Sequence, residues 1–226
     1  PAPITKFAAA AKYADLAGEV GKAMGLELKS LGVNIDWAPV CDINSNPKNP
    51  VIGDRSFSPH AEGVRDAALA FATALRSCQV AACAKHFPGH GDTEKDSHLE
   101  LPLLKLSEDE LFRRELVPFQ ALIESGIPLV MTSHILFPKI DEYCPATLSR
   151  KILDGILRRR LGFGEVVVSD DLDMKAVSDG FKKGETIGQA LNAGCDMFIV
   201  ARNPDTSIQK ALGLAASVGS CLRSGL

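Results

Sequence analysis

The chain has 226 residues, of which 46% are apolar, and a formal net charge of −3 at pH 7. This length and apolar content suit a single α/β domain over residues 1–226, and the small net charge predicts no nucleic-acid partner. Neither a signal peptide nor a membrane-spanning segment is visible, so no membrane partner is expected either. The six cysteines lack CxxC spacing, which is typical of reduced thiols in a cytoplasmic protein.

Segments with helical patterns alternate with strand-like segments. The first segment, residues 4–31, is rich in alanine and has apolar residues at helical spacing, and Gly32 ends the pattern. Around residue 107 a capping box marks a helix start, with Ser107 as the N-cap and Glu110 three positions later. Further helices are predicted over residues 61–77, 107–124, 149–161, 184–193 and 207–222.

Five predicted strands are near-continuous apolar runs, and most of them lead into polar residues. They cover residues 33–40, 80–86, 127–134, 164–171 and 195–200. Unbroken apolar runs between helices indicate a parallel sheet that is covered on both faces. The pattern fits a (β/α)8 TIM-type barrel or a doubly wound sheet, and in both the site lies at the carboxyl ends of the strands. No GxGxxG or Walker A sequence indicates nucleotide binding.

The loop that begins at Lys85 holds the densest group of titratable residues. Residues 85–98 contain three of the five histidines, two lysines and three carboxylates. Pro88 and the neighbouring glycines prevent a regular helix there. A strand therefore leads into a polar loop, the usual place for binding and catalytic residues on a rigid scaffold.

The histidines of this loop allow several interpretations. His86, His90 and His98 could bind zinc, but Pro88 removes the helix that would give the four-residue spacing its meaning. Asp96, Ser97 and His98 are the residue types of a serine triad, although sequence neighbours rarely face one another. A simpler interpretation is that Asp96 orients His98, which then serves as an acid/base group near neutral pH.

Two other polar positions have both a structural and a chemical interpretation. Asp170 and Asp171 end the strand with three valines and could cap the following helix, or one of them could take part in chemistry. Asp42 follows the first strand and Arg55 lies across a polar loop from it. These two could form a surface ion pair or belong to a site.

These segments together resemble glycoside hydrolase family 3, and more closely its β-N-acetylglucosaminidases of peptidoglycan recycling. Lys85 to Gly91, followed by Asp96-Ser97-His98, is similar to the family signature, and Val168 to Met174 is similar to its nucleophile segment. Further similar blocks are Ala38 to Asp42, Gly53 to Phe57 and Ala190 to Met197.

The resemblance implies a retaining glycoside hydrolase with no metal or organic cofactor. It makes Asp170 the nucleophile and His98 the acid/base, with Asp96 as the partner of His98. Asp42, Arg55, Lys85 and His86 match positions that bind sugar hydroxyls. The expected partner is a carbohydrate with terminal β-linked N-acetylglucosamine, from peptidoglycan or muropeptide fragments, and the protein is expected to be a monomer.

Three alternatives stay open within this resemblance: a β-glucosidase or β-xylosidase of the same family, a glycoside phosphorylase, and an inactive sugar-binding module. The family barrel normally opens with a strand that has no match before Pro1, and more barrel is expected after Val200. The fold is therefore expected to be an incomplete barrel, with about one strand missing at each end.

Overall fold

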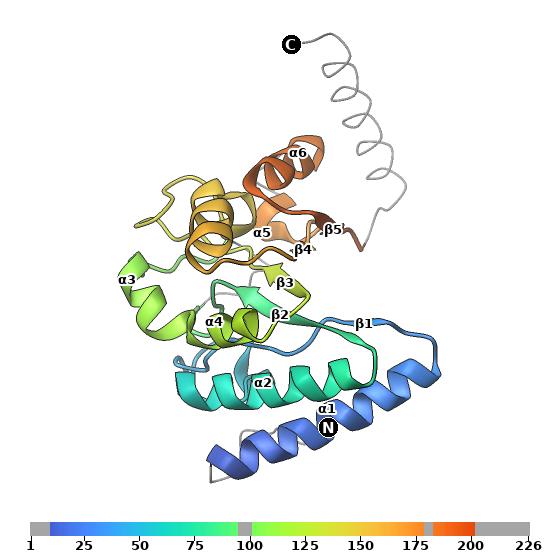
Figure 1. Ribbon diagram of the computed structural model, residues 1–226. Helices are drawn as coiled ribbons and strands as arrows, with labels where there is room; N and C mark the ends of the chain where they lie inside the picture. Colours follow the sequence, from blue (N-terminus) through green and yellow to red (C-terminus); the bar gives the residue numbers. More distant parts are fainter. Residues whose placement is uncertain (1–9, 95–100, 179–182, 202–226) are drawn as a thin grey trace.

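In the computed structural model, residues 10–94, 101–178 and 183–201 are described (Figure 1). Their strands form one parallel sheet in the order β1-β2-β3-β4-β5, which is the order of the chain. The strands are β1 (Ile35–Asp36), β2 (Ala81–Phe87), β3 (Leu129–Thr132), β4 (Val166–Asp171) and β5 (Met197–Ile199). A doubly wound sheet reverses its strand order at a switch point, whereas a barrel wall does not. The prediction of a TIM-type barrel that is incomplete is confirmed: the described strands form an open half-barrel.

Helices cover the outer face of this sheet. They are α1 (Ala10–Ser30), α2 (Ala61–Ser77), α3 (Glu108–Glu110), α4 (Val117–Glu124), α5 (Lys175–Ser178) and α6 (Lys183–Ala193). Figure 1 shows α1 lying along α2 on one side of the sheet. Gly21 permits this approach, because a Cβ there would lie 2.6 Å from the carbonyl oxygen of Phe71. The predicted helix over residues 207–222 lies outside the described residues.

Strand residues alternate between two apolar clusters. Val130 and Val167 belong to the large cluster between the sheet and the helices, whereas Met131 and Val168 belong to a smaller cluster on the inner face. This two-sided burial is the reason that the strands read as unbroken apolar runs. The described cysteines are free thiols, as expected, and three of them are buried: Cys41, Cys83 and Cys195.

The predicted helix over residues 107–124 is correct at its start but is not regular. The capping box is present, with the Glu110 N–H donating to Ser107 Oγ at 3.3 Å and the Ser107 N–H donating to Glu110 Oε2 at 2.6 Å. The chain then widens into a π-helical stretch, Leu111–Glu115, before α4 begins. Pro118 explains this, because it has no N–H to donate to the carbonyl of Arg114 and its ring would collide with that carbonyl in a regular helix.

Two other elements differ from their predicted form. The predicted strand over residues 33–40 is regular only at Ile35–Asp36, because Pro39 has no N–H for the ladder. Val40 nevertheless forms an isolated parallel bridge with Lys85, so the two segments stay adjacent. The predicted helix over residues 149–161 is present as a π-helical stretch, Lys151–Arg160. In the described residues, none of the helices combines the length and apolar character that crossing a bilayer requires.

Gly91 allows the loop after β2 to lie directly on the segment after β1. A Cβ at this position would lie 1.7 Å from the carbonyl oxygen of Ile43, which is a backbone atom that cannot rotate away. We therefore expect Gly91→Ala to lower the free energy of unfolding by about 1–3 kcal/mol or more, as in other overpacked sites. Chemical denaturation measures this change.

Gly164→Ala is the matched control, because no atom lies within 4 Å of a Cβ placed there. Equal stability of the two variants would show that the close contact at Gly91 is not a constraint.

Candidate active site

The carboxyl ends of the strands border a cavity of about 300 Å³. Lys85 and His86 reach it from β2, Asp170 from β4, and Arg55 from the loop after β1. Four of the predicted site residues are thus brought together from three parts of the chain. The remaining lining residues are His90 and four apolar ones: Trp37, Val51, Met131 and Ile199.

The two adjacent aspartates at the end of β4 have different surroundings. Asp170 borders the cavity, and its Oδ1 accepts the N–H of Asp171 at 2.8 Å. Asp171 Oδ1 accepts two backbone N–H groups instead, from Asp173 at 3.0 Å and from Ala201 at 3.1 Å. Asp171 therefore holds the turn after the strand, and Asp170 is the carboxylate that a ligand in the cavity can reach.

The charges around Asp170 favour its ionised form. Burial alone would raise the pKa of Asp170, but the attraction of His86, the hydrogen bond from the Asp171 N–H and the attraction of Lys85 together outweigh burial, and the pKa is lowered. Burial and the nearby Arg55 guanidinium lower the pKa of Lys85, which Asp170 partly offsets. The cavity thus places an ionised carboxylate opposite cationic hydrogen-bond donors.

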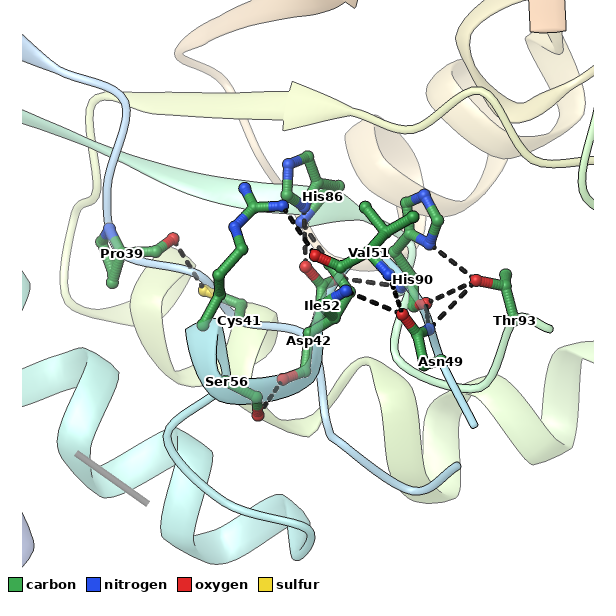
Figure 2. A network of polar contacts seen from close by, with 11 residues as sticks. Pro39, Cys41, Asp42, Asn49, Val51, Ile52, Ser56, His86, His90 and Thr93 are labelled. Atoms are coloured by element: carbon green, nitrogen blue, oxygen red, sulfur yellow. Dashed lines mark hydrogen bonds and ion pairs between the residues drawn. The ribbon is translucent and has the colours of Figure 1, made fainter. Parts of the chain in front are cut away.

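Asp42 is fully buried and lies behind His86 (Figure 2). Its Oδ2 lies 2.7 Å from His86 Nδ1, and its Oδ1 accepts the backbone N–H groups of His86 at 3.2 Å and His90 at 2.7 Å. Burial would raise the pKa of Asp42, but the attraction of His86 outweighs it and the pKa is lowered. Asp42 is not among the residues that border the cavity. Its contacts with the His86 ring and backbone instead hold His86 in position at the cavity wall. A direct contact between Asp42 and a sugar stays a prediction, which this burial disfavours.

His134 supports the strand end that carries Asp170. Its Nε2 donates to the carbonyl oxygen of Asp171 at 3.0 Å, and its Nδ1 lies 2.8 Å from Thr147 Oγ1. Burial lowers the pKa of His134, so the ring is neutral near neutral pH. The only sequence signal for this residue is its position at the polar end of the segment predicted at 127–134, which does not indicate a chemical role. Trp37 lies within the strand predicted at 33–40, and the sequence likewise does not indicate that it lines the cavity.

The interpretation of the loop histidines as zinc ligands gains no support from the part of the chain that the structure describes. No group of three or more His, Cys, Asp or Glu side chains that could hold a metal is found among those residues. The Nδ1 atoms of His86 and His90 are occupied by Asp42 and by Thr93. Asp96 and His98 lie outside the described residues, so their roles stay predictions.

Residues 1–221 match the sequence model of the "Glycosyl hydrolase family 3 N terminal domain". The chain belongs to glycosyl hydrolase family 3. It is 40% identical to a beta-hexosaminidase of Methylococcus capsulatus over 230 residues, which cover 97% of this chain and 68% of the relative. The chain spans between 33% and 68% of the length of eight curated beta-hexosaminidase relatives that it matches.

Solved structures agree with this family assignment. A family 3 beta-N-acetylglucosaminidase from Paenibacillus sp. FPU-7 superposes with a TM-score of 0.87 at 42% identity, over 90% of this chain and 40% of that one. A beta-glucoside phosphorylase, BglX, superposes with a TM-score of 0.85 at 29% identity, over 90% of this chain and 38% of that one. At these identities the shared barrel is evidence for the family.

Beneath the site, this family 3 domain buries a second carboxylate, Glu115. Its side chain lies against Gly89, where a Cβ would be 2.9 Å from Glu115 Oε2. Arg114 donates from Nε to Glu115 Oε1 at 2.6 Å and from Nη2 to Asp92 Oδ2 at 2.7 Å. Arg114 thereby connects Glu115 to Asp92 in the loop after β2. Burial raises the pKa of Glu115 to about 7, although Arg114 opposes this shift.

The raised pKa of Glu115 predicts a pH-dependent stability. In the unfolded chain a glutamate has a pKa of about 4.3, so between pH 4.3 and 7 the folded state binds more protons than the unfolded state. This contribution to the free energy of unfolding is fully present below pH 4.3. It is lost as the pH rises to about 7, by an amount on the order of 3 kcal/mol.

Glu115→Gln keeps a neutral side chain at every pH and should lack this loss. The stability of the variant minus that of the wild type should therefore rise from pH 4.5 to 7.5 and then level off, as measured by denaturation at a series of pH values. Glu124→Gln, which removes an exposed carboxylate, is the control. A difference for Glu115→Gln that does not change with pH would contradict the assignment.

Proposed function

We propose that the chain is the catalytic barrel of a retaining exo-β-N-acetylglucosaminidase. The substrate would be terminal β-linked N-acetylglucosamine of peptidoglycan fragments, and the location the cytoplasm. One observation carries the proposal: the ionised Asp170 borders a cavity at the strand ends together with Lys85, His86 and Arg55. The printed names of the relatives, beta-hexosaminidase and beta-N-acetylglucosaminidase, support the choice of sugar.

In the proposed first step, one Asp170 oxygen attacks the anomeric carbon and the bond to the leaving oxygen breaks. The proton for that oxygen comes from His98, which Asp96 orients. In the second step His98 removes a proton from water, and the water oxygen attacks the glycosyl ester and frees Asp170. The lowered pKa of Asp170 suits this role, because only the ionised carboxylate is a nucleophile.

The cavity composition suits a single sugar ring. Lys85 and Arg55 supply hydrogen-bond donors for hydroxyl groups, and the apolar side chains of Trp37 and Met131 can cover the carbon face of a ring. A volume of about 300 Å³ lies at the lower end of ligand pockets, which favours removal of one terminal residue over cleavage within a chain.

Substrate choice and the adjacent aspartates test the proposal together. The protein should hydrolyse an aryl β-N-acetylglucosaminide in preference to the aryl β-glucoside. Asp170→Ala should lower kcat by at least about 10³-fold, as loss of a nucleophile does in other enzymes. Asp171→Ala, the matched control, should keep most of the activity and lower thermal stability, because it removes two hydrogen bonds to the backbone. Preference for the glucoside would favour the β-glucosidase alternative, and similar activities of the two variants would refute the role of Asp170.

The acid/base role proposed for His98 predicts a dependence on the leaving group. His98→Ala should slow hydrolysis of substrates with poor leaving groups by about 10²–10⁴-fold. The loss should be smaller for nitrophenyl glycosides, because their leaving oxygen hardly needs a proton. Asp96→Asn should show the same trend more weakly. A uniform loss across leaving groups of very different pKa would indicate that His98 only binds substrate.

Phosphorolysis is the second candidate, and the similarity to the beta-glucoside phosphorylase structure is the observation that favours it. In that reaction phosphate replaces water and a sugar 1-phosphate is the product. A histidine acid/base, unlike a carboxylate, would not repel the phosphate anion. Formation of sugar 1-phosphate in phosphate buffer, faster than free sugar, would decide for this candidate.

A further inference from the structure

Two adjacent side chains that do not border the cavity, Arg114 and Glu115, hold the part of the loop after β2 that runs from Gly89 to Asp92. Glu115 packs against Gly89 so closely that a Cβ there would lie 2.9 Å from Glu115 Oε2. Arg114 Nη2 donates to Asp92 Oδ2 at 2.7 Å. His90 lies between these two contacts and borders the cavity, so movement of either contact changes the cavity wall.

The loop after β1 holds the same segment. Ser45 Oγ donates to Asp92 Oδ1 at 3.1 Å, and the amide of Asn49 donates to the His90 carbonyl oxygen at 2.8 Å (Figure 2). Of these donors and Arg114, only Arg114 carries a charge, so it attracts the Asp92 carboxylate as well as donating to it. The contact between Arg114 and Asp92 is therefore the one that a change of charge nearby can weaken.

Arg114 also binds Glu115, so that one cation is shared by two carboxyl groups. Its Nε donates to Glu115 Oε1 at 2.6 Å, whereas the buried Oε2 has no hydrogen-bond partner among the residues that the structure describes. An ionised Glu115 would thus have an unpaired charged oxygen in a side chain that is 1% exposed, which is strongly unfavourable. Asp42 and Asp92 would repel this charge in addition. The geometry therefore favours the neutral form of Glu115.

We propose that Asp92, Arg114 and Glu115 form a positioning network for the loop after β2, in which neutral Glu115 leaves Arg114 to hold Asp92, and ionised Glu115 weakens that hold and slows turnover. The proposal rests on the proposed function, because the turnover is that of the same cavity. Ionisation acts in two ways: the new charge attracts Arg114 away from Asp92, and it repels the Asp92 carboxylate directly.

The charged groups that act most on Glu115 are Arg114, Asp42 and Asp92. Burial raises the pKa of Glu115 to about 7, and Arg114 opposes this shift. The two aspartates add to it. The change of charge therefore falls within the pH range in which activity can be measured.

The pH dependence of kcat/KM separates this network from a purely structural role, because kcat/KM reports groups that ionise in the free enzyme. Glu115→Gln resembles the protonated carboxyl group and cannot ionise, so the ratio of its kcat/KM to that of the wild type should rise with pH. A group with a pKa of about 7 is about 90% protonated at pH 6 and about 3% protonated at pH 8.5. The rise between these pH values should therefore lie between about threefold and about 30-fold.

Two features of this design exclude other groups. The ratio cancels any group that titrates in both proteins, and a nitrophenyl N-acetylglucosaminide as substrate removes most of the dependence on a proton from His98. Glu124→Gln, which removes an exposed carboxylate, is the control and should give a constant ratio. A ratio for Glu115→Gln that does not change with pH, in an enzyme that is active, would overturn the proposal.

Asp92→Asn tests the sharing of Arg114 without a substrate. The variant removes a like charge and leaves Arg114 to Glu115, so the pKa of Glu115 should fall below that of the wild type. Carbon-13 NMR of protein labelled at the glutamate carboxyl carbons measures this pKa, and the signal of Glu115 is assigned by its loss in Glu115→Gln. Glu124→Gln should leave the pKa of Glu115 unchanged. The same pKa of Glu115 in Asp92→Asn and in the wild type would overturn the network.

The two measurements also separate this proposal from the proposed function. If the wild type hydrolyses no glycoside but Asp92→Asn lowers the pKa of Glu115, the proposed function fails and the coupling of the three side chains stands. If the wild type hydrolyses the N-acetylglucosaminide and the ratio for Glu115→Gln is constant, the proposed function stands and the effect of the network on turnover is refuted.

Discussion

The buried carboxylate of Asp42 is the contact on which the arrangement of the site depends. It joins the segment after β1 to the loop after β2, because it accepts hydrogen bonds from the His86 ring and from the backbone of both His86 and His90. Hydrogen bonds to a charged group contribute about 1.5–3 kcal/mol each, and an isolated buried carboxylate would be strongly unfavourable. Each of these donors therefore helps to compensate the buried charge, and together they tie the loop after β2 to the segment after β1.

Close backbone approach adds to this constraint. The loop after β2 packs on Ile43 through Gly91 and on Glu115 through Gly89, so it lies between two parts of the chain with no room for side chains. Glu115 is unfavourable in its ionised form at this buried position, and Arg114 offsets part of that cost while it holds Asp92. The described part of this loop, residues 88–94, is thus a packed element of the barrel.

The sequence predicted those features that depend on local pattern. Apolar runs that lead into polar residues indicated the parallel sheet and the edge where Lys85, His86 and Asp170 meet. The choice between Asp170 and Asp171 rested on resemblance, and the structure adds a physical difference, since only Asp170 borders the cavity.

Other features could not be read from the sequence because they depend on contacts between distant segments. Asn49 lies in a loop rich in asparagine, and nothing local distinguishes it from its neighbours. Glu115 lies four residues from each of the buried residues Leu111 and Phe119, but this spacing does not show that its carboxylate packs against the loop at Gly89. The π-helical stretch before α4 had a local signal in Pro118, which the helical pattern obscured.

The central claim is that Asp170 is the carboxylate that reacts with the sugar. A 2-fluoro sugar with a good leaving group forms a long-lived glycosyl ester on the nucleophile of a retaining enzyme, and peptide mass mapping locates the labelled residue. The account predicts a stoichiometric label on Asp170. A label on Asp171, or on any other carboxylate, would contradict it.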